Sequence, residues 1–150
     1  MNKLHESKQL KDITVEDMMI PAEKVAHVQL NNPLEHALLI LIKSGYSAVP
    51  VLDASYKLAG AIGKTEILDQ ILGLDRYETE KLSHMKVHEV MNADMPSVTG
   101  DTNFIEGLKA VIDVPFVCVV DKEGHFDGIL TRRAILKVVK RDYFATEKYL

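Results

Sequence analysis

The sequence predicts an α+β (α/β) fold made of two copies of one unit, each running strand, helix, strand, strand, helix. Three pairs of similar segments support this prediction, in the same order and at nearly the same spacing: residues 14–19 (TVEDMM) and 86–91 (KVHEVM), residues 51–53 (VLD) and 119–121 (VVD), and residues 60–68 and 128–136. A duplication with a short deletion in the second copy accounts for all three. Two half-domains of this size usually fold as one pseudo-twofold pair, so we expect a ligand in the cleft between them.

Apolar runs bounded by turn residues predict the strands of the first copy. A short strand is expected at residues 25–28, and two longer ones at residues 48–52 and 58–63. A polar turn at residues 53–56 separates the two longer strands. The pair therefore has the pattern of a hairpin.

Capping signals predict the helices of the first copy. Thr14 is a helix cap with Asp17 three residues later. Pro33 lies in the first turn of the next helix and Gly45 ends it, while a further helix begins at Lys64. The apolar face of the middle helix is expected from residues at helical spacing, Leu34, Leu38, Leu41 and Ile42.

The second copy repeats this order. Asp101 caps a helix, and the last helix begins near Arg132 and runs towards Lys140. Strands are expected at residues 97–98, 116–120 and 127–130, with a turn at residues 121–124. The apolar residues of the helix after Asp101 are Ile105, Leu108, Val111 and Ile112.

These elements divide the chain into two repeats and two polar segments. The first repeat covers residues 12–73 and the second residues 84–140, joined by a charged connector at residues 74–83. Residues 1–13 form a polar lead-in, helical or loose. The tail at residues 141–150 is expected to be frayed or used in contacts.

Composition narrows the class of protein. The chain has 150 residues, 47% of them hydrophobic and 27% charged, which is ordinary for a globular protein. A net charge of −4 argues against non-specific nucleic-acid binding. There is no apolar run of the ~20 residues that span a bilayer, and the N-terminus lacks the apolar stretch of a signal peptide. We therefore expect a cytoplasmic protein with no nucleic-acid or membrane partner.

Two motifs point to a known family. Residues 45–50 (GYSAVP) and residues 128–133 (GILTRR) resemble the marks of the cystathionine-β-synthase (CBS) domain, which occurs as tandem pairs called Bateman modules. The resemblance covers residues 12–140. It implies adenosyl ligands bound in the cleft between the two copies and a flat, disc-shaped homodimer.

The chain is more similar still to the stand-alone bacterial CBS proteins that bind the second messenger cyclic di-AMP. The segments that carry this resemblance are residues 23–28, 34–38, 45–53 and 131–133. It implies a non-enzymatic cyclic di-AMP receptor that regulates partner proteins according to its ligand state. By resemblance the partners are the (p)ppGpp synthetase/hydrolase of the stringent response and pyruvate carboxylase.

The ribose motif departs from the family pattern in both copies. A CBS site for AMP or ATP typically uses an acid to hold the ribose diol and a Thr or Ser three residues earlier. Copy one has Gly63 and Glu66 at these places, and copy two has Thr131 and Ala134. A 3′,5′-cyclic dinucleotide has no free vicinal diol, so the departure favours cyclic di-AMP over AMP, ADP or ATP.

Copy two offers cations instead of the acid. Arg132 and Arg133 follow Thr131 at a helix start, where free backbone N–H groups and the helix dipole favour anions. Guanidinium groups add bidentate hydrogen bonds to phosphate. We expect these three residues to hold a phosphodiester.

The other expected ligand contacts come from copy one. Lys24 is a candidate for the phosphate or base, the backbone of Val25 and Ala26 for an adenine edge, and Tyr46 for a purine face. Ser47 and Ala48 are small enough to let a nucleotide approach. The matching segment of copy two, residues 113–116 (DVPF), is bulkier and acidic, so we expect one working site per chain and two per dimer.

Other interpretations stay open at this point. Arg132 and Arg133 would be a solvated helix face, Tyr46 ordinary packing and Lys24 a surface lysine in a ligand-free dimerisation or scaffold module. The alternative ligand class is AMP, ADP or ATP. No cofactor, metal site or enzyme activity is expected: the spacing of Glu80, His84 and His88 lacks a closing ligand set, and Cys118 lies in an apolar strand as a buried, inert thiol.

Overall fold

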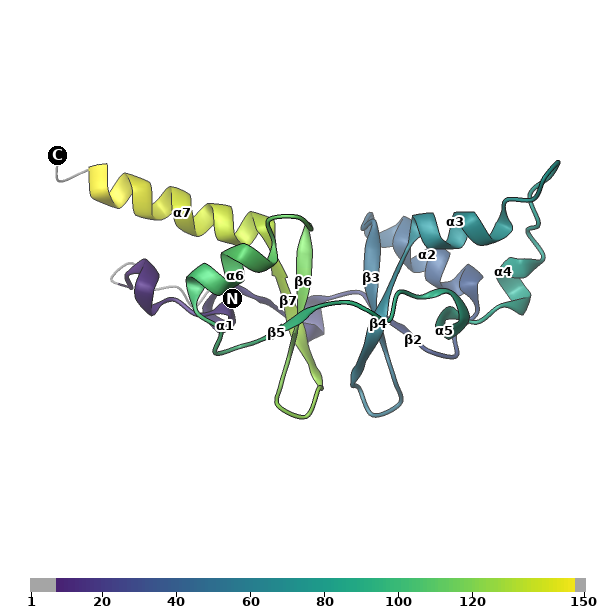
Figure 1. Ribbon diagram of the computed structural model, residues 1–150, viewed down its shortest axis with the longest axis horizontal. Helices are drawn as coiled ribbons and strands as arrows, with labels where there is room; N and C mark the ends of the chain where they lie inside the picture. Colours follow the sequence, from purple (N-terminus) through teal and green to yellow (C-terminus); the bar gives the residue numbers. More distant parts are fainter. Residues whose placement is uncertain (1–7, 148–150) are drawn as a thin grey trace. The chain divides into compact units, whose positions relative to one another are not determined.

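The computed structural model describes residues 8–147, which form two compact units (Figure 1). One unit, called here the β7 unit, contains the chain up to Val25 and from Pro96 onwards. The other, the β3 unit, contains Ala26–Met95. Residues 1–7 of the expected lead-in and 148–150 of the expected tail lie outside the described residues. Each unit therefore combines most of one sequence repeat with the start of the other. The exact limits of the two repeats remain a prediction from the sequence.

The β3 unit is a three-stranded sheet with helices packed on it. Its strands are β2 (Val28–Gln29), β3 (Ala48–Leu52) and β4 (Leu58–Gly63), in the order β2-β3-β4, with β2 parallel and β4 antiparallel to β3. The helices are α2 (Leu34–Ser44), α3 (Lys64–Ile71), α4 (Lys81–His84) and α5 (Val87–Val90). Helices α2 and α3 pack beside each other (Figure 1). The core is apolar and includes Leu34, Leu41, Val49, Val51, Ile62, Ile67 and Val87.

The β7 unit has a four-stranded sheet in the order β1-β7-β6-β5. Its elements are η1 (Leu10–Asp12), α1 (Val15–Met18), β1 (Ile20–Pro21), η2 (Ala22–Lys24), β5 (Ser97–Thr99), α6 (Phe104–Ala110), β6 (Phe116–Val120), β7 (Phe126–Thr131) and α7 (Arg132–Glu147). Strand β6 is parallel to β5 and antiparallel to β7. The core includes Ile13, Val15, Phe104, Val117, Val119, Leu130 and Ile135.

The first helix of each sequence repeat lies in the unit that contains most of the other repeat: α1 lies in the β7 unit and α5 in the β3 unit. The amide of Val15 donates to the carbonyl oxygen of Thr102 at 2.9 Å, and the amide of Val87 donates to that of Asn32 at 2.9 Å. Both valine side chains are fully buried. Because these bonds satisfy amides at the open end of each short helix, and the valines fill a core, the two helices are fixed where local sequence alone does not place them.

The glycine that is repeated in the two copies makes room for a crossing chain. A Cβ on Gly60 would lie 2.5 Å from the carbonyl oxygen of Asn92, and a Cβ on Gly128 would meet that of Ile20. Ala61 and Asn92 form a β-bridge, and Ile20 pairs with Ile129 in β1 and β7. The glycine is therefore required in both copies because another backbone segment lies close to it in each unit.

Most of the predicted elements are confirmed, with corrections at their ends. Residues 25–28 are not one strand, because the chain forms η2 and then only Val28–Gln29 as β2. Pro33 is the N-cap of α2 rather than a residue of its first turn. Ile42 does not belong to the apolar face, since 61% of its surface is exposed, and Ala37 is buried there instead.

The second copy needs similar corrections. Asn103, not Asp101, caps α6, and its side-chain oxygen accepts a hydrogen bond from the amide of Glu106 at 2.9 Å. Helix α6 ends at Ala110, before Val111 and Ile112. The last helix does not stop near Lys140: α7 continues to Glu147, so the described part of the expected tail is helical.

Between residues 8 and 147, no helix has the length and apolar character needed to cross a membrane.

Candidate functional site

Thr131 connects β7 to α7 and caps the helix. Its hydroxyl oxygen accepts a hydrogen bond from the amide of Ala134 at 3.0 Å, which is the side-chain capping geometry of a helix N-terminus. The hydroxyl hydrogen is left to donate. With 16 residues, α7 presents the positive end of its dipole at Arg132.

The Arg132 side chain is held by the end of α6. Its Nε donates to the carbonyl oxygen of Val111 at 3.0 Å, and its Nη2 donates to that of Ile112 at 3.2 Å. The Arg132 side chain, although exposed, is thus held in place by two backbone carbonyl groups. A guanidinium has five N–H donors, so three donors remain for a ligand.

Arg133 differs from its neighbour. It is exposed, and its side chain makes no hydrogen bond or ion pair within the described part of the chain. Thr131, Arg132 and Arg133 thus form one group in which a capping hydroxyl, a fixed guanidinium and a free guanidinium lie at a helix N-terminus. This combination suits an oxyanion, because side-chain donors and positive charge lie on neighbouring residues at a helix N-terminus.

Lys24 and Val25 belong to the same unit as this group. Lys24 is exposed at the end of η2, and Val25 is buried. Helix η2 contacts β7. Because β1 runs antiparallel to β7, the chain after Pro21 heads towards the beginning of β7, whereas Thr131 is its last residue. The structure brings Thr131 and the two arginines together and places Lys24 towards the other end of the strand.

The remaining candidates lie in the β3 unit. Ala26 is half-buried ahead of β2, Tyr46 and Ser47 are exposed after α2, and Ala48 begins β3. Tyr46 has 40% of its surface exposed, so its ring is available to a ligand. The carbonyl oxygen of Ser47 accepts the amide hydrogen of Lys64 at 3.1 Å, which joins this loop to the start of α3.

Glu66 stands at the ribose-acid position of copy one but is engaged elsewhere. Its Oε1 accepts the amide hydrogen of Gly63 at 2.7 Å, which is the carboxylate half of a capping box at the start of α3, since Gly63 has no side chain to complete it. A Cβ on Gly63 would lie 2.8 Å from the carbonyl oxygen of Ser47. The carboxylate therefore stabilises the helix terminus in the place where an AMP site would have its diol ligand.

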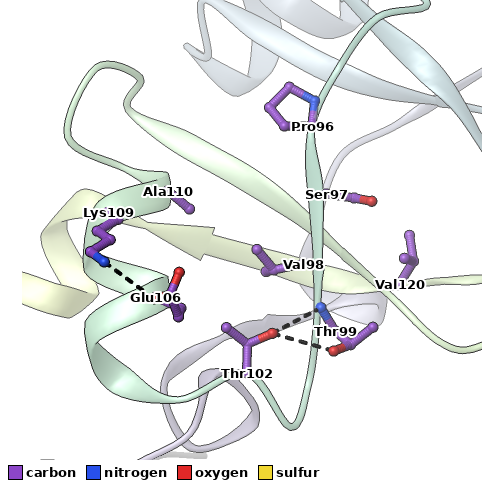
Figure 2. A pocket seen from close by; sticks show the side chains of 9 residues that line it. All are labelled: Pro96, Ser97, Val98, Thr99, Thr102, Glu106, Lys109, Ala110 and Val120. Atoms are coloured by element: carbon purple, nitrogen blue, oxygen red, sulfur yellow. Dashed lines mark hydrogen bonds and ion pairs between the residues drawn. The ribbon is translucent and has the colours of Figure 1, made fainter.

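A cavity that the sequence did not predict lies along β5 and α6. Its volume is about 640 Å³, and Figure 2 shows Thr102 beside Thr99 and the Glu106–Lys109 ion pair across its wall. The Thr99 and Thr102 hydroxyls lie 3.3 Å apart, as do the two charged groups. These four polar groups of the wall are paired with one another, unlike the guanidinium of Arg133.

Three metal-ligating residues gather in the β6–β7 turn. The ligand atoms of Asp121, Glu123 and His125 lie within 4.8 Å of one another, and they form the only such group in the described ranges. The Asp121 carboxylate accepts hydrogen bonds within the turn. Burial raises the pKa of this carboxyl, but hydrogen bonds from the His125 and Glu123 amides outweigh burial and lower it. Glu80, which shares helical spacing with His84 and His88 in the sequence, accepts a hydrogen bond from Nη2 of Arg76 at 2.7 Å.

Cys118 is buried in β6, as the sequence predicts. Burial raises the pKa of its thiol to about 12. Since the thiolate is the reactive form, this side chain is inert at neutral pH.

Comparison with known proteins decides the family. A model of the CBS domain matches residues 15–73 and 87–141. The chain belongs to the CBS-domain family. The predicted family and the predicted α+β tandem pair are thereby confirmed.

Several similar proteins are bacterial. The Cyclic di-AMP receptor B of Bacillus subtilis is 49% identical over 136 residues, 91% of this chain and 92% of the receptor. The crystal structure of Listeria monocytogenes CbpB in complex with c-di-AMP is 52% identical, with a TM-score of 0.81, and covers 87% of this chain and 98% of CbpB. A CBS-domain protein of unknown function from Bacillus anthracis is 55% identical, with a TM-score of 0.83, over 88% of this chain and 96% of that one.

Proposed function

We propose that this CBS protein is a non-enzymatic receptor for cyclic di-AMP. The observation that carries the proposal is the group formed by Thr131, Arg132 and Arg133, which offers oxyanion donors where an AMP site would need a diol ligand. The copy-one acid, Glu66, is engaged by the backbone amide of Gly63 at the start of α3. Relatives at about half identity include a protein named as a cyclic di-AMP receptor and one solved in complex with this ligand.

We assign each candidate residue a role in ligand binding. One phosphodiester is bound by the free donors of Arg132, by Arg133 and by the Thr131 hydroxyl. Exposed Tyr46 packs on a purine face, and the backbone of Val25 and Ala26 meets an adenine edge. The small residues Ser47 and Ala48 admit the nucleotide, and Lys24 contacts a more distant phosphate or base.

The receptor acts as a homodimer in this proposal. Apolar side chains are exposed on two helix pairs: Leu39, Ile42 and Leu68 on α2 and α3, and Ile105, Leu136 and Val139 on α6 and α7. Exposed apolar clusters of this kind commonly mark protein interfaces. A second copy covers these faces.

Signalling requires a partner that distinguishes the two ligand states. The coupling can be no larger than the difference in ligand affinity between partner-bound and free receptor. By family resemblance we propose the cytoplasmic (p)ppGpp synthetase/hydrolase, and pyruvate carboxylase, as the regulated proteins.

A thermal-shift series tests the proposed ligand. A ligand at 100 times its dissociation constant adds about 2.7 kcal/mol to the free energy of unfolding. At roughly 2–4 °C per kcal/mol for a chain of this size, the midpoint rises by about 5–10 °C. We expect this rise with cyclic di-AMP and not with AMP, ADP or ATP. A rise with ATP alone identifies an energy sensor, and no rise with any nucleotide identifies a ligand-free scaffold.

A further inference from the structure

The helices that precede β3 and β6, α2 and α6, end in different ways. Helix α2 ends at Gly45, whose left-handed backbone (φ +77°) lets its amide donate to the carbonyl oxygen of Leu41 at 3.0 Å. Helix α6 has no such residue: the residue that follows its last one, Ala110, is Val111 with φ −110° and ψ 11°. The carbonyl oxygens of Leu108 and Lys109 accept the amide hydrogens of Val111 and Ile112 at 3.2 and 3.4 Å. The carbonyl oxygens of Val111 and Ile112, just past the helix, take their donors from elsewhere.

Arg132 supplies these donors from a distant part of the chain. Its Nε and Nη2 bind the carbonyl oxygens of Val111 and Ile112 at 3.0 and 3.2 Å, and its own amide donates to the carbonyl oxygen of Pro115 at 2.9 Å. One residue therefore holds both ends of the connection between α6 and β6, residues 111–115. The matching residue of copy one, Lys64, makes the corresponding backbone bond to Ser47, and within the described chain no side-chain bond from it to α2.

The geometry of the guanidinium leaves one edge unused. Nε and Nη2 form one side of its planar fork, and that side faces α6. The hydrogens on Nη1 and the second hydrogen on Nη2 form the other edge, which is the edge that binds phosphate oxygens in a bidentate manner. Binding to α6 and binding to a phosphodiester are therefore compatible.

We propose that the end of α6 positions the Arg132 guanidinium for the ligand phosphate, so that ligand binding and the order of residues 111–115 are coupled. This inference rests on the proposed function and adds a route by which the site is regulated. An arginine fixed in advance loses less rotamer freedom when it binds. Because coupling is reciprocal, a ligand that fixes Arg132 also orders the connection, which carries the exposed side chain of Ile112.

Amide hydrogen exchange tests the cap in the ligand-free protein. Arg132→Lys keeps the charge but replaces the planar fork by a point donor, which loosens the turn after α6. The amides of Val111 and Ile112 donate to Leu108 and Lys109 in that turn, so we expect them to exchange about tenfold faster. Lys137→Ala is the matched control, because it removes an exposed cation from the same helix and makes none of these bonds. It is expected to leave both amides unchanged. In the unaltered protein, the Nε–H of Arg132 should itself exchange slowly.

The same two variants are then titrated with cyclic di-AMP by calorimetry. We expect Arg132→Lys to bind at least about tenfold more weakly than Lys137→Ala. In the unaltered protein, the ligand should slow exchange at Val111 and Ile112 and leave the Nε–H of Arg132 protected.

The outcomes separate this inference from the proposed function. If the unaltered protein does not bind cyclic di-AMP, the proposed function fails, and the coupling fails with it. If it binds the ligand, but Arg132→Lys binds equally well or the ligand leaves the Val111 and Ile112 amides unaffected, the coupling is overturned and the receptor function stands. Fast exchange of the Arg132 Nε–H in the free protein also overturns it, without any substitution.

Discussion

Replacing Thr131 by alanine removes one hydrogen bond from the helix cap and one donor from the proposed phosphate site. The hydroxyl oxygen accepts the amide hydrogen of Ala134 at 3.0 Å. Loss of such a cap costs about 0.5–2 kcal/mol of stability. At roughly 2–4 °C per kcal/mol, a loss near the middle of that range lowers the unfolding midpoint of the ligand-free protein by about 2–5 °C.

The same substitution should weaken ligand binding separately. The hydroxyl hydrogen is free to donate to a phosphate oxygen, and a hydrogen bond to a charged group contributes about 1.5–3 kcal/mol. Calorimetry should therefore show cyclic di-AMP binding to Thr131→Ala about tenfold or more weakly. Thr131→Ser keeps the hydroxyl and is the control, with near-normal stability and affinity expected. A Thr131→Ala protein that melts and binds like the original would refute both the cap and the ligand role.

Three further predictions concern the scaffold. Gly128→Ala should lower the free energy of unfolding by at least about 2 kcal/mol, because the new Cβ meets the Ile20 carbonyl oxygen, and denaturant titration measures this. Asp17→Asn should be destabilising near neutral pH and neutral in acid. Burial raises the pKa of the Asp17 carboxyl, but the hydrogen bond from Lys8 helps to outweigh this and to lower that pKa below 3.8. The carboxylate therefore stabilises the folded protein above pH 3.8, and this stabilisation is lost as the pH falls through the lowered pKa. The Cys118 thiol, with a pKa of about 12, should resist alkylation at pH 8 until the protein unfolds.

Each of these has a control or a contrary result. Gly100→Ala is the control for Gly128→Ala, because a Cβ on Gly100 would meet nothing nearer than 3.4 Å. This control should lower the free energy of unfolding far less than Gly128→Ala does. If the stability difference between the unaltered protein and the Asp17→Asn variant persisted unchanged down to about pH 2, the ion pair would be contradicted. Rapid labelling of Cys118 in the folded protein would mean that β6 opens readily.

The strands and capping signals were predictable from the sequence because they are local. Apolar runs between turn residues gave β3 and β4 with the bounds that the structure has, and Gly45 ends α2 with a positive φ as expected. Thr14 and Asp17 form the predicted capping box. These features depend on residues within a few positions of one another.

What the sequence did not predict concerns contacts between distant residues. Nothing near Val15 or Val87 says which sheet its helix packs on, since both copies have the same local pattern. The bonds from Arg132 to the end of α6 join residues 20 and 21 positions apart, so the sequence showed only a cationic helix start. One signal was present: residues 111–115 contain no glycine where copy one has Gly45.

The candidate site was predictable as a set of residue types but not as an arrangement. Thr131, Arg132 and Arg133 share one helix start, so their proximity followed from the sequence. The position of Lys24 towards the opposite end of β7 depends on the antiparallel pairing of Ile20 and Ile129, which no local pattern specifies.

Calorimetric titration of the purified protein with cyclic di-AMP and, in parallel, with AMP and ATP tests the central claim most directly. The account predicts saturable binding of cyclic di-AMP with one ligand per chain, and no comparable binding of AMP or ATP. Saturable binding of AMP or ATP together with no heat from cyclic di-AMP would contradict it.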